Sequence, residues 1–238
     1  MLSVGDRPKR ANQHSGEPRL ANIAKTFEQD SATPRKILQW AARAFPTERI
    51  AATASFSDTI LIEHISENLP QSDIVFLNTG LHFAETLGTR DAAQQRYPHL
   101  NFVTIEPEQT VSEQAQTEGA RLWETNPTRC CNLRKVKPLS KILENYDVWI
   151  TGVRRTDHPS RADTPAVAWH PQHKVVKINP LAFTNDRENN ILGIELNLLI
   201  NPLRQIGYDS IGCEPCTIPS EGREGRWDGL KVECGLHV

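Results

Sequence analysis

The stretch RIAATASFSDTILIEHISENLPQSDIVFLNTG (residues 49–80) changes from a short apolar run to a helical pattern and back to an apolar run. RIAATASF (49–56) and DIVFLNTG (73–80) are typical of buried strands, whereas TILIEHISENL (59–69) has apolar residues at helical spacing. Two parallel strands need a crossover connection of this kind, most often a helix. The stretch therefore predicts an α/β fold.

The same alternation continues along the chain. It predicts a mostly parallel sheet with helices on both faces, and a ligand site beyond the carboxyl ends of the strands. We expect a flexible tail at 1–20, one α/β domain at 21–216 and a mobile C-terminal arm at 217–238, whose 22 residues look irregular. The further expected elements are helices at 23–27, 35–45, 82–97, 111–124, 133–146 and 185–200, and strands at 100–105, 147–154 and 175–181.

Composition narrows the class of protein. A chain of 238 residues with 38% hydrophobic content can bury one sizeable core. The formal charge of −2 gives no general basic field for nucleic acid, so an anion site must be a local cluster of Lys and Arg. No apolar run approaches the roughly 20 residues of a membrane span, and the first 20 residues lack the apolar centre of a secretory signal. We expect a cytoplasmic protein with a small-molecule partner, without membrane or nucleic acid binding.

Two strand ends carry candidate ligand-binding loops. In SFSDT (55–59), the hydroxyls of Ser55, Ser57 and Thr59 and the free N–H groups of a following helix can hold an anion, although such residues also cap helices. In NTG (78–80), Thr79 and Gly80 allow a close approach to a ligand or form a tight turn. The sequence leaves both alternatives open.

Basic residues gather in two segments, GVRRTDHPSR (152–161) and EGREGRW (221–227). Each segment alone resembles a solvated surface. Together they would suit an anionic substrate, because guanidinium groups bind phosphate and sulfate oxygens bidentately. The arginines concerned are Arg154, Arg155, Arg161, Arg223 and Arg226.

Four of the five cysteines form two close pairs, Cys130 with Cys131 and Cys213 with Cys216. Four thiolates fit a tetrahedral zinc ion or an iron-sulfur cluster, and the CEPC pair (213–216) could also be a redox motif. Adjacent cysteines diverge, which favours the separate iron corners of a cluster over one zinc ion.

The fifth thiol, Cys234, lies four residues from the end in ECGLHV (233–238). A lone terminal cysteine can be inert. Here glycines surround it, and basic neighbours such as Lys231 and His237 favour the thiolate, which is the nucleophilic form. A flexible arm with a reactive sulfur is therefore the preferred interpretation.

Three segments, CCNLRKVKPL (130–139), GYDSIGCEPCT (207–217) and KVECGLHV (231–238), together resemble one known family. It is the assimilatory sulfonucleotide reductases, and specifically the adenosine 5′-phosphosulfate (adenylyl-sulfate) reductases that contain iron and sulfur. DVWITGVRRTDHPSRADTPAV (147–167) and VVKINPLA (175–182) also look like family blocks.

The resemblance implies an adenine nucleotide α-hydrolase-like fold, also described as PAPS reductase-like. It implies one 4Fe-4S cluster on Cys130, Cys131, Cys213 and Cys216, with Cys234 as the catalytic nucleophile. The activity implied is reduction of adenosine 5′-phosphosulfate to sulfite and AMP, through an S-sulfocysteine, by thioredoxin or a similar thiol. This is a step of assimilatory sulfate reduction toward cysteine biosynthesis. The implied substrate contacts are Ser55, Ser57, Thr79, Gly80, Lys135, Arg161, Arg223, Arg226 and His237.

Three alternatives remain. The first is a 3′-phosphoadenosine 5′-phosphosulfate reductase, although family members restricted to that substrate usually lack the four cluster cysteines. The second is a non-catalytic nucleotide-binding domain stabilised by zinc. The third is an ATP-dependent sulfur-transfer or amidation enzyme on the same fold, which the missing glycine-rich loop disfavours.

Overall fold

The centre of the molecule is a six-stranded sheet with the strand order β3-β2-β1-β4-β6-β5. The computed structural model describes residues 17–231 and 233–237. Every neighbouring pair of strands is parallel except β5 and β6, which are antiparallel. The strands are β1 (Ile50–Thr53), β2 (Asp73–Leu77), β3 (Asn101–Ile105), β4 (Val148–Thr151), β5 (Val167–His170) and β6 (Val175–Ile178).

The two central strands set the register of the sheet. Ala52 of β1 lies opposite Ile74 of β2 on one side and Ile150 of β4 on the other. These three residues are at most 1% exposed. Strands buried on both faces read as continuous apolar runs rather than as an alternation, which is why the sequence signals them clearly.

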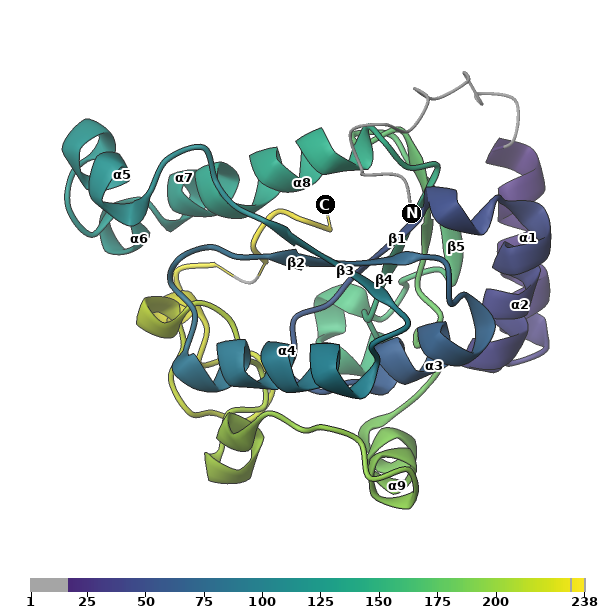
Figure 1. Ribbon diagram of the computed structural model, residues 1–238. Coiled ribbons are helices and arrows are strands. Elements are labelled where there is room, and N and C mark those ends of the chain that lie inside the picture. The colour runs from purple at the N-terminus through teal and green to yellow at the C-terminus, as the bar shows by residue number, and fades with distance from the viewer. Residues whose placement is uncertain (1–16, 232, 238) are drawn as a thin grey trace.

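Helices cover both faces of the sheet, as Figure 1 shows. α3 (Ile60–Asn68) and α4 (Ala84–Arg96) lie on one face, where Ile62 and Ile65 join the larger hydrophobic core. α8 (Lys137–Leu143) lies on the other face, where Leu139 and Leu143 pack with Trp149 in a second, smaller core.

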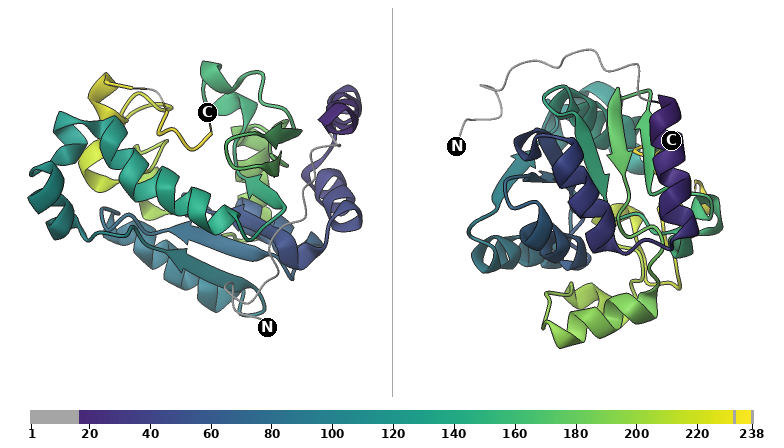
Figure 2. Two further views of the ribbon diagram at one scale, coloured as in Figure 1. Left: turned by 90° about the horizontal axis from the view of Figure 1, so that it is seen from above. Right: turned by 90° about the vertical axis from the view of Figure 1, so that its right-hand side faces the viewer.

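The N-terminal helices pack at the β5 side of the sheet. α1 (Glu17–Gln29) runs along β5, and α2 (Pro34–Ala44) contacts α3 (Figure 2). The start of α2 follows from the sequence, because Pro34 occupies the first turn and the Thr33 hydroxyl accepts a hydrogen bond from the Lys36 amide at 3.3 Å.

This architecture confirms the predicted fold class, but several boundaries differ. α1 begins at Glu17, inside the expected tail; residues 1–16 of that tail lie outside the described residues. The expected helix at 111–124 is divided at Gly119, whose φ of 93° interrupts it. β5, for which no strand was expected, forms the antiparallel edge beside β6. The segment 111–124 consists of α5 (Val111–Glu118) and α6 (Leu122–Thr125). The helix expected at 185–200 is shorter, α9 (Asp186–Glu195).

The helix expected at 133–146 is also more complex. It consists of a π-helical turn η4 (Asn132–Val136) followed by α8, and a further short helix, α7 (Pro127–Cys131), directly precedes it. Such single π-turns commonly occur at functional sites. The remaining short helices are η3 (Thr47–Arg49), η5 (Arg155–Asp157), η6 (Pro159–Arg161), η7 (Pro202–Ile206), η8 (Glu214–Cys216) and η9 (Trp227–Gly229).

Candidate active site

A cavity of about 510 Å³ opens at the carboxyl ends of the two central strands. The chain passes from β1 outward to β2 and β3, then returns to place β4 on the other side of β1. Such a change of direction leaves a crevice outside the strand ends, where open α/β sheets bind ligands. Ser55 and Ser57 after β1, and Gly152 and Val153 after β4, line this cavity.

The β1–α3 loop presents its hydroxyl groups to the cavity. Ser55 Oγ and Ser57 Oγ lie 3.4 Å apart, and the Asp58 carboxylate accepts the Ile60 amide at 3.0 Å at the start of α3. Burial raises the pKa of Asp58. Between the serines, Phe56 has a φ of 56° and a fully buried ring. Its burial holds the backbone in this uncommon conformation and turns both serines toward the cavity.

The NTG turn after β2 faces a different direction. Thr79 is fully buried, and its hydroxyl lies 3.3 Å from Cys213 Sγ. Gly80 has a φ of 70°, and a Cβ there would lie 3.3 Å from the guanidinium of Arg134, which donates to the Thr79 carbonyl. Neither Thr79 nor Gly80 lines the cavity. The structure thus places Thr79 beside Cys213 and Gly80 beside Arg134, outside the lining of the cavity.

Four basic residues form one part of the cavity lining, which we call the basic wall. Lys135, Arg161, Arg223 and Arg226 all line the cavity. Burial lowers the pKa of Arg226, whose guanidinium stacks 4.4 Å from the Trp227 ring centroid. Burial also opposes the charge on Lys135, but nearby cysteines outweigh it and raise its pKa. The wall can therefore hold an anion with two or more negative charges.

Arg226 owes its position to a glycine in a neighbouring segment. A Cβ at Gly212 would lie 2.0 Å from Arg226 Nη2, so only a residue without a side chain leaves room for the guanidinium. Arg226 Nη1 also donates to Ser210 Oγ at 3.2 Å. The segment before Cys213 thus holds a cation at the cavity.

The two cysteine pairs converge beside the same wall. Cys130 and Cys131 end α7, where the Asn126 side chain caps the helix, and Cys213 and Cys216 flank η8. Burial raises the pKa of Cys216 to about 12, and the other three thiols add to the effect. A chain of contacts joins the two pairs, because Gln114 Nε2 lies 3.9 Å from Cys130 Sγ and Arg134 donates both to Gln114 and to the carbonyl of Thr79, which lies beside Cys213. All five cysteines are free thiols.

The arrangement of the thiols limits the kind of metal site that they can form. Among residues 17–231 and 233–237, no three His, Cys, Asp or Glu side chains are arranged to hold one metal ion. A tetrahedral zinc ion would need sulfurs only about 3.8 Å apart. A cluster instead takes each thiolate on a separate iron, so that its ligands stand farther apart.

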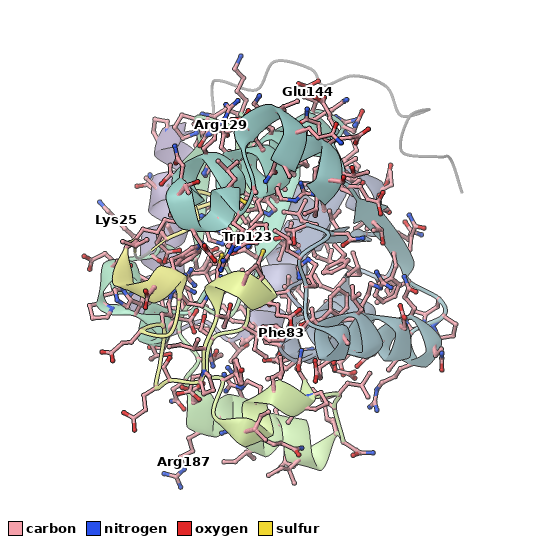
Figure 3. The ribbon with its side chains drawn as sticks, turned by 90° about the vertical axis from the view of Figure 1, so that its left-hand side faces the viewer. Lys25, Phe83, Trp123, Arg129, Glu144 and Arg187 are labelled. Atoms are coloured by element: carbon pink, nitrogen blue, oxygen red, sulfur yellow. The ribbon has the colours of Figure 1, made fainter. Side chains whose placement is uncertain are left out.

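Two buried donors near this group lack an acceptor. Trp123 Nε1 and Arg226 Nε have no hydrogen-bond partner among the described residues. Trp123 belongs to α6, which packs on η8, and Figure 3 shows it between the α6–α7 layer and the C-terminal segments. Arg226 interacts electrostatically with Cys131, Cys213 and Cys216. Sulfide ions of a cluster would provide acceptors for such donors, so the residues fit a cluster better than zinc.

The C-terminal arm is docked against the cavity. Cys234 and His237 both line it, and the last described residues of the arm lie between α8 and the sheet (Figure 1). Leu236 packs against the smaller core. The His237 ring stacks on Trp149, with centroids 5.3 Å apart and an angle of 8° between the planes. The expected nucleophile is therefore held beside the basic wall.

Several cavity residues were not among the candidate residues. Asp157, Arg204 and Trp227 line the cavity, and Asp157 accepts hydrogen bonds from Arg154 and from Arg161. The position of Asp157 just after β4 was the available signal. Nothing in the local sequence indicates Trp149, which faces the arm from the middle of a strand.

Comparisons with known proteins agree with this geometry. Residues 50–219 match a family model described as the phosphoadenosine phosphosulfate reductase domain. An adenosine 5′-phosphosulfate reductase of Mycolicibacterium smegmatis is 42% identical over 94% of this chain and 97% of its own length. A protein of the same name from Streptomyces coelicolor is 43% identical over 88% of this chain and 90% of its own length.

Solved structures agree on the fold. A phosphoadenylyl-sulfate reductase from Candida auris covers 89% of this chain and all of its own, with a TM-score of 0.73 and 24% identity. A Candida glabrata FMN adenylyltransferase has a TM-score of 0.58 at 13% identity, covering 88% of this chain and 70% of its own. These similarities confirm the expected adenine nucleotide α-hydrolase-like architecture.

Proposed function

Because the chain belongs to the phosphoadenosine phosphosulfate reductase domain family, we propose that it is an enzyme that reduces adenosine 5′-phosphosulfate to sulfite and AMP. The observation that carries this proposal is the position of Cys234, which lies in one cavity with Lys135, Arg161, Arg223 and Arg226 at the end of the central strands. Relatives about 40% identical over most of the chain bear the name of this activity. The described chain contains no helix that is long and apolar enough to span a membrane.

The cavity suggests how the substrate lies. The nucleoside end fits the crevice near Ser55 and Ser57, and the phosphosulfate end fits the basic wall. Positive charge there offsets the repulsion between an anionic thiolate and an anionic sulfate group, and it stabilises the charge that develops on the leaving phosphate. Thr79 and Gly80 are not part of this proposed contact surface.

The reaction then proceeds in two thiol steps. The Cys234 thiolate attacks the sulfate sulfur, the sulfur–oxygen bond to the phosphate breaks, and AMP leaves with that electron pair. Cys234 now carries a sulfonate. A dithiol reductant such as thioredoxin attacks Cys234 Sγ, so that sulfite leaves and a mixed disulfide forms. The second thiol of the reductant then releases the Cys234 thiolate, and the reductant has supplied both electrons.

The cofactor proposed for the converging thiols is one 4Fe-4S cluster on Cys130, Cys131, Cys213 and Cys216. When bound, such a cluster contributes to the electrostatic field of the site, and the electrons for sulfite come from the thiol reductant. Lys135 lies within electrostatic reach of Cys213 and Cys234, so it faces both the cluster ligands and the nucleophile. We place the enzyme in the cytoplasm, where thiol reductants operate.

A labelling experiment tests the proposal directly. The anaerobically purified protein is incubated with labelled adenosine 5′-phosphosulfate and no reductant, and its peptides are analysed by mass spectrometry. We expect one sulfonate group on Cys234 and none on the other cysteines, with no sulfite from the Cys234→Ser variant. Label on another residue, or sulfite from that variant, would contradict the proposal.

The 3′-phosphorylated nucleotide is the second candidate substrate, because the family model and the Candida auris structure carry its name. The ratio of kcat/KM for the two nucleotides decides between them. We expect a clear preference for adenosine 5′-phosphosulfate; a preference for the 3′-phosphorylated form would reverse the assignment. Iron and sulfide analysis separates both from the zinc-stabilised alternative.

A further inference from the structure

The residue before the nucleophile makes close contacts with two of the cavity arginines. Arg161 Nε donates to Glu233 Oε1 at 2.7 Å, and Arg161 Nη2 donates to Glu233 Oε2 at 2.9 Å. Arg223 Nη2 donates to the same Oε2 at 3.2 Å. The three side chains are only 12% to 16% exposed, so water screens these contacts weakly.

These contacts use the groups that an oxyanion would need. Every nitrogen of the Arg161 guanidinium donates to a carboxylate, because Nη1 donates to Asp157 at 3.1 Å while Nε and Nη2 hold Glu233. Burial opposes the charge on Glu233, but Arg161 and Arg223 outweigh it and lower the pKa of this carboxyl group. The bidentate edge that suits sulfate or phosphate is thus occupied by a carboxylate of the enzyme's own arm.

We propose that Glu233 is a positioning residue whose carboxylate occupies the oxyanion site of the ligand-free enzyme, docks the Cys234 segment there, and is displaced by the phosphate or sulfate group of the nucleotide. This inference rests on the proposed function. Since both anions need the same guanidinium edge, each weakens the binding of the other by the same factor. Glu233 therefore holds the nucleophile at the site before the substrate arrives, and on binding its carboxylate yields the guanidinium edge while Cys234 stays beside the incoming sulfate group.

Nucleotide affinity tests the competition. AMP, which has the phosphate but no reactive sulfate, is titrated calorimetrically into the wild-type holoenzyme and into Glu233→Gln, which keeps the shape but removes the charge. Glu224→Gln is the matched control, because Glu224 lies in the same arm with an exposed side chain. We expect Glu233→Gln to bind AMP about tenfold more tightly and the control to equal the wild type. Equal or weaker binding by Glu233→Gln would overturn the proposal.

Alkylation of Cys234 tests docking without any nucleotide. Peptide mass spectrometry measures the rate at this one thiol, and Glu233→Gln should react about fivefold faster than the wild type and the control. A wild type that fails to bind AMP would refute the nucleotide assignment, whereas equal alkylation rates would refute the role of Glu233 alone.

Discussion

The stack of His237 on Trp149 makes docking of the arm dependent on pH. Burial, together with the nearby cations Lys177, Arg161 and Arg223, lowers the pKa of His237 well below its ordinary value of 6.5. The docked arm therefore requires the neutral imidazole. A released arm returns His237 to an ordinary pKa, so docking is fully favourable above about pH 6.5 and is weakened as the pH falls below it.

The size of this effect follows from proton linkage. At about pH 5.5, one unit below the ordinary pKa, the ratio of docked to released arm should fall by about tenfold, which is ~1.4 kcal/mol. Two neighbouring groups keep their charge between about pH 5.5 and 7, so they do not contribute to this change. Burial is the main reason that the pKa of Lys177 is lowered to about 8, and Lys177 is protonated in this range. The lowered pKa of Glu233 keeps its carboxylate ionised.

Alkylation of Cys234 between about pH 7 and 5.5 provides the assay. Dividing the wild-type rate by that of His237→Phe cancels the titration of the thiol itself, because the phenyl ring can stack on Trp149 but cannot take up a proton. We expect the ratio to rise about tenfold toward pH 5.5. A ratio that stays constant across this range would refute the reasoning, since the protonation of His237 would then not affect docking.

Three further outcomes follow from other contacts. Arg49→Ala should lower the free energy of unfolding by about 2 kcal/mol, because it leaves the buried Asp147 carboxylate without its bidentate partner. Chemical denaturation measures this change. As a control, Lys36→Ala removes an exposed ion pair and should lower the free energy of unfolding by less than about 0.5 kcal/mol. Gly212→Ala should displace the Arg226 guanidinium and raise KM for the nucleotide about tenfold while the melting temperature stays near that of the wild type; an unchanged KM in steady-state assays would argue against this contact. Removal of iron by a chelator under anaerobic conditions should make four more thiols reactive per chain, counted by thiol titration, and no increase would mean that the cysteine quartet holds no metal.

The central part of the fold was predictable because it depends on local patterns. β1, β2 and β4 are buried on both faces and stand out as apolar runs between helical segments. β5 was missed because Val167–His170 is a short edge strand. It pairs with β6 because the chain between the two strands turns back, and the composition of β5 does not show this turn. The break at Gly119 and the π-turn at Asn132–Val136 were likewise missed, because a helical periodicity shows neither of them.

The candidate site divides in the same way. Clustered cysteines and clustered arginines each indicate only a few kinds of site, so their grouping in the sequence indicated which residues would come together. The structure places Cys234 in one cavity with Arg161, Arg223 and Arg226. The direction in which a loop faces was not predictable. Thr79 points to Cys213 because Arg134 holds the NTG turn from the far side, a contact across 55 residues. Glu233 was overlooked because its role depends on two distant arginines rather than on its neighbours.

The position of Leu236 has a consequence for the durability of this protein. Leu236 adds to the smaller core only while the C-terminal arm is docked. When the arm leaves the cavity to meet the reductant, it exposes part of the smaller hydrophobic core. Leu236 must return to this core before the protein regains its full stability. The rate of irreversible inactivation should therefore increase with the number of times the arm undocks. Continuous turnover with nucleotide and reductant would shorten the lifetime of each enzyme molecule.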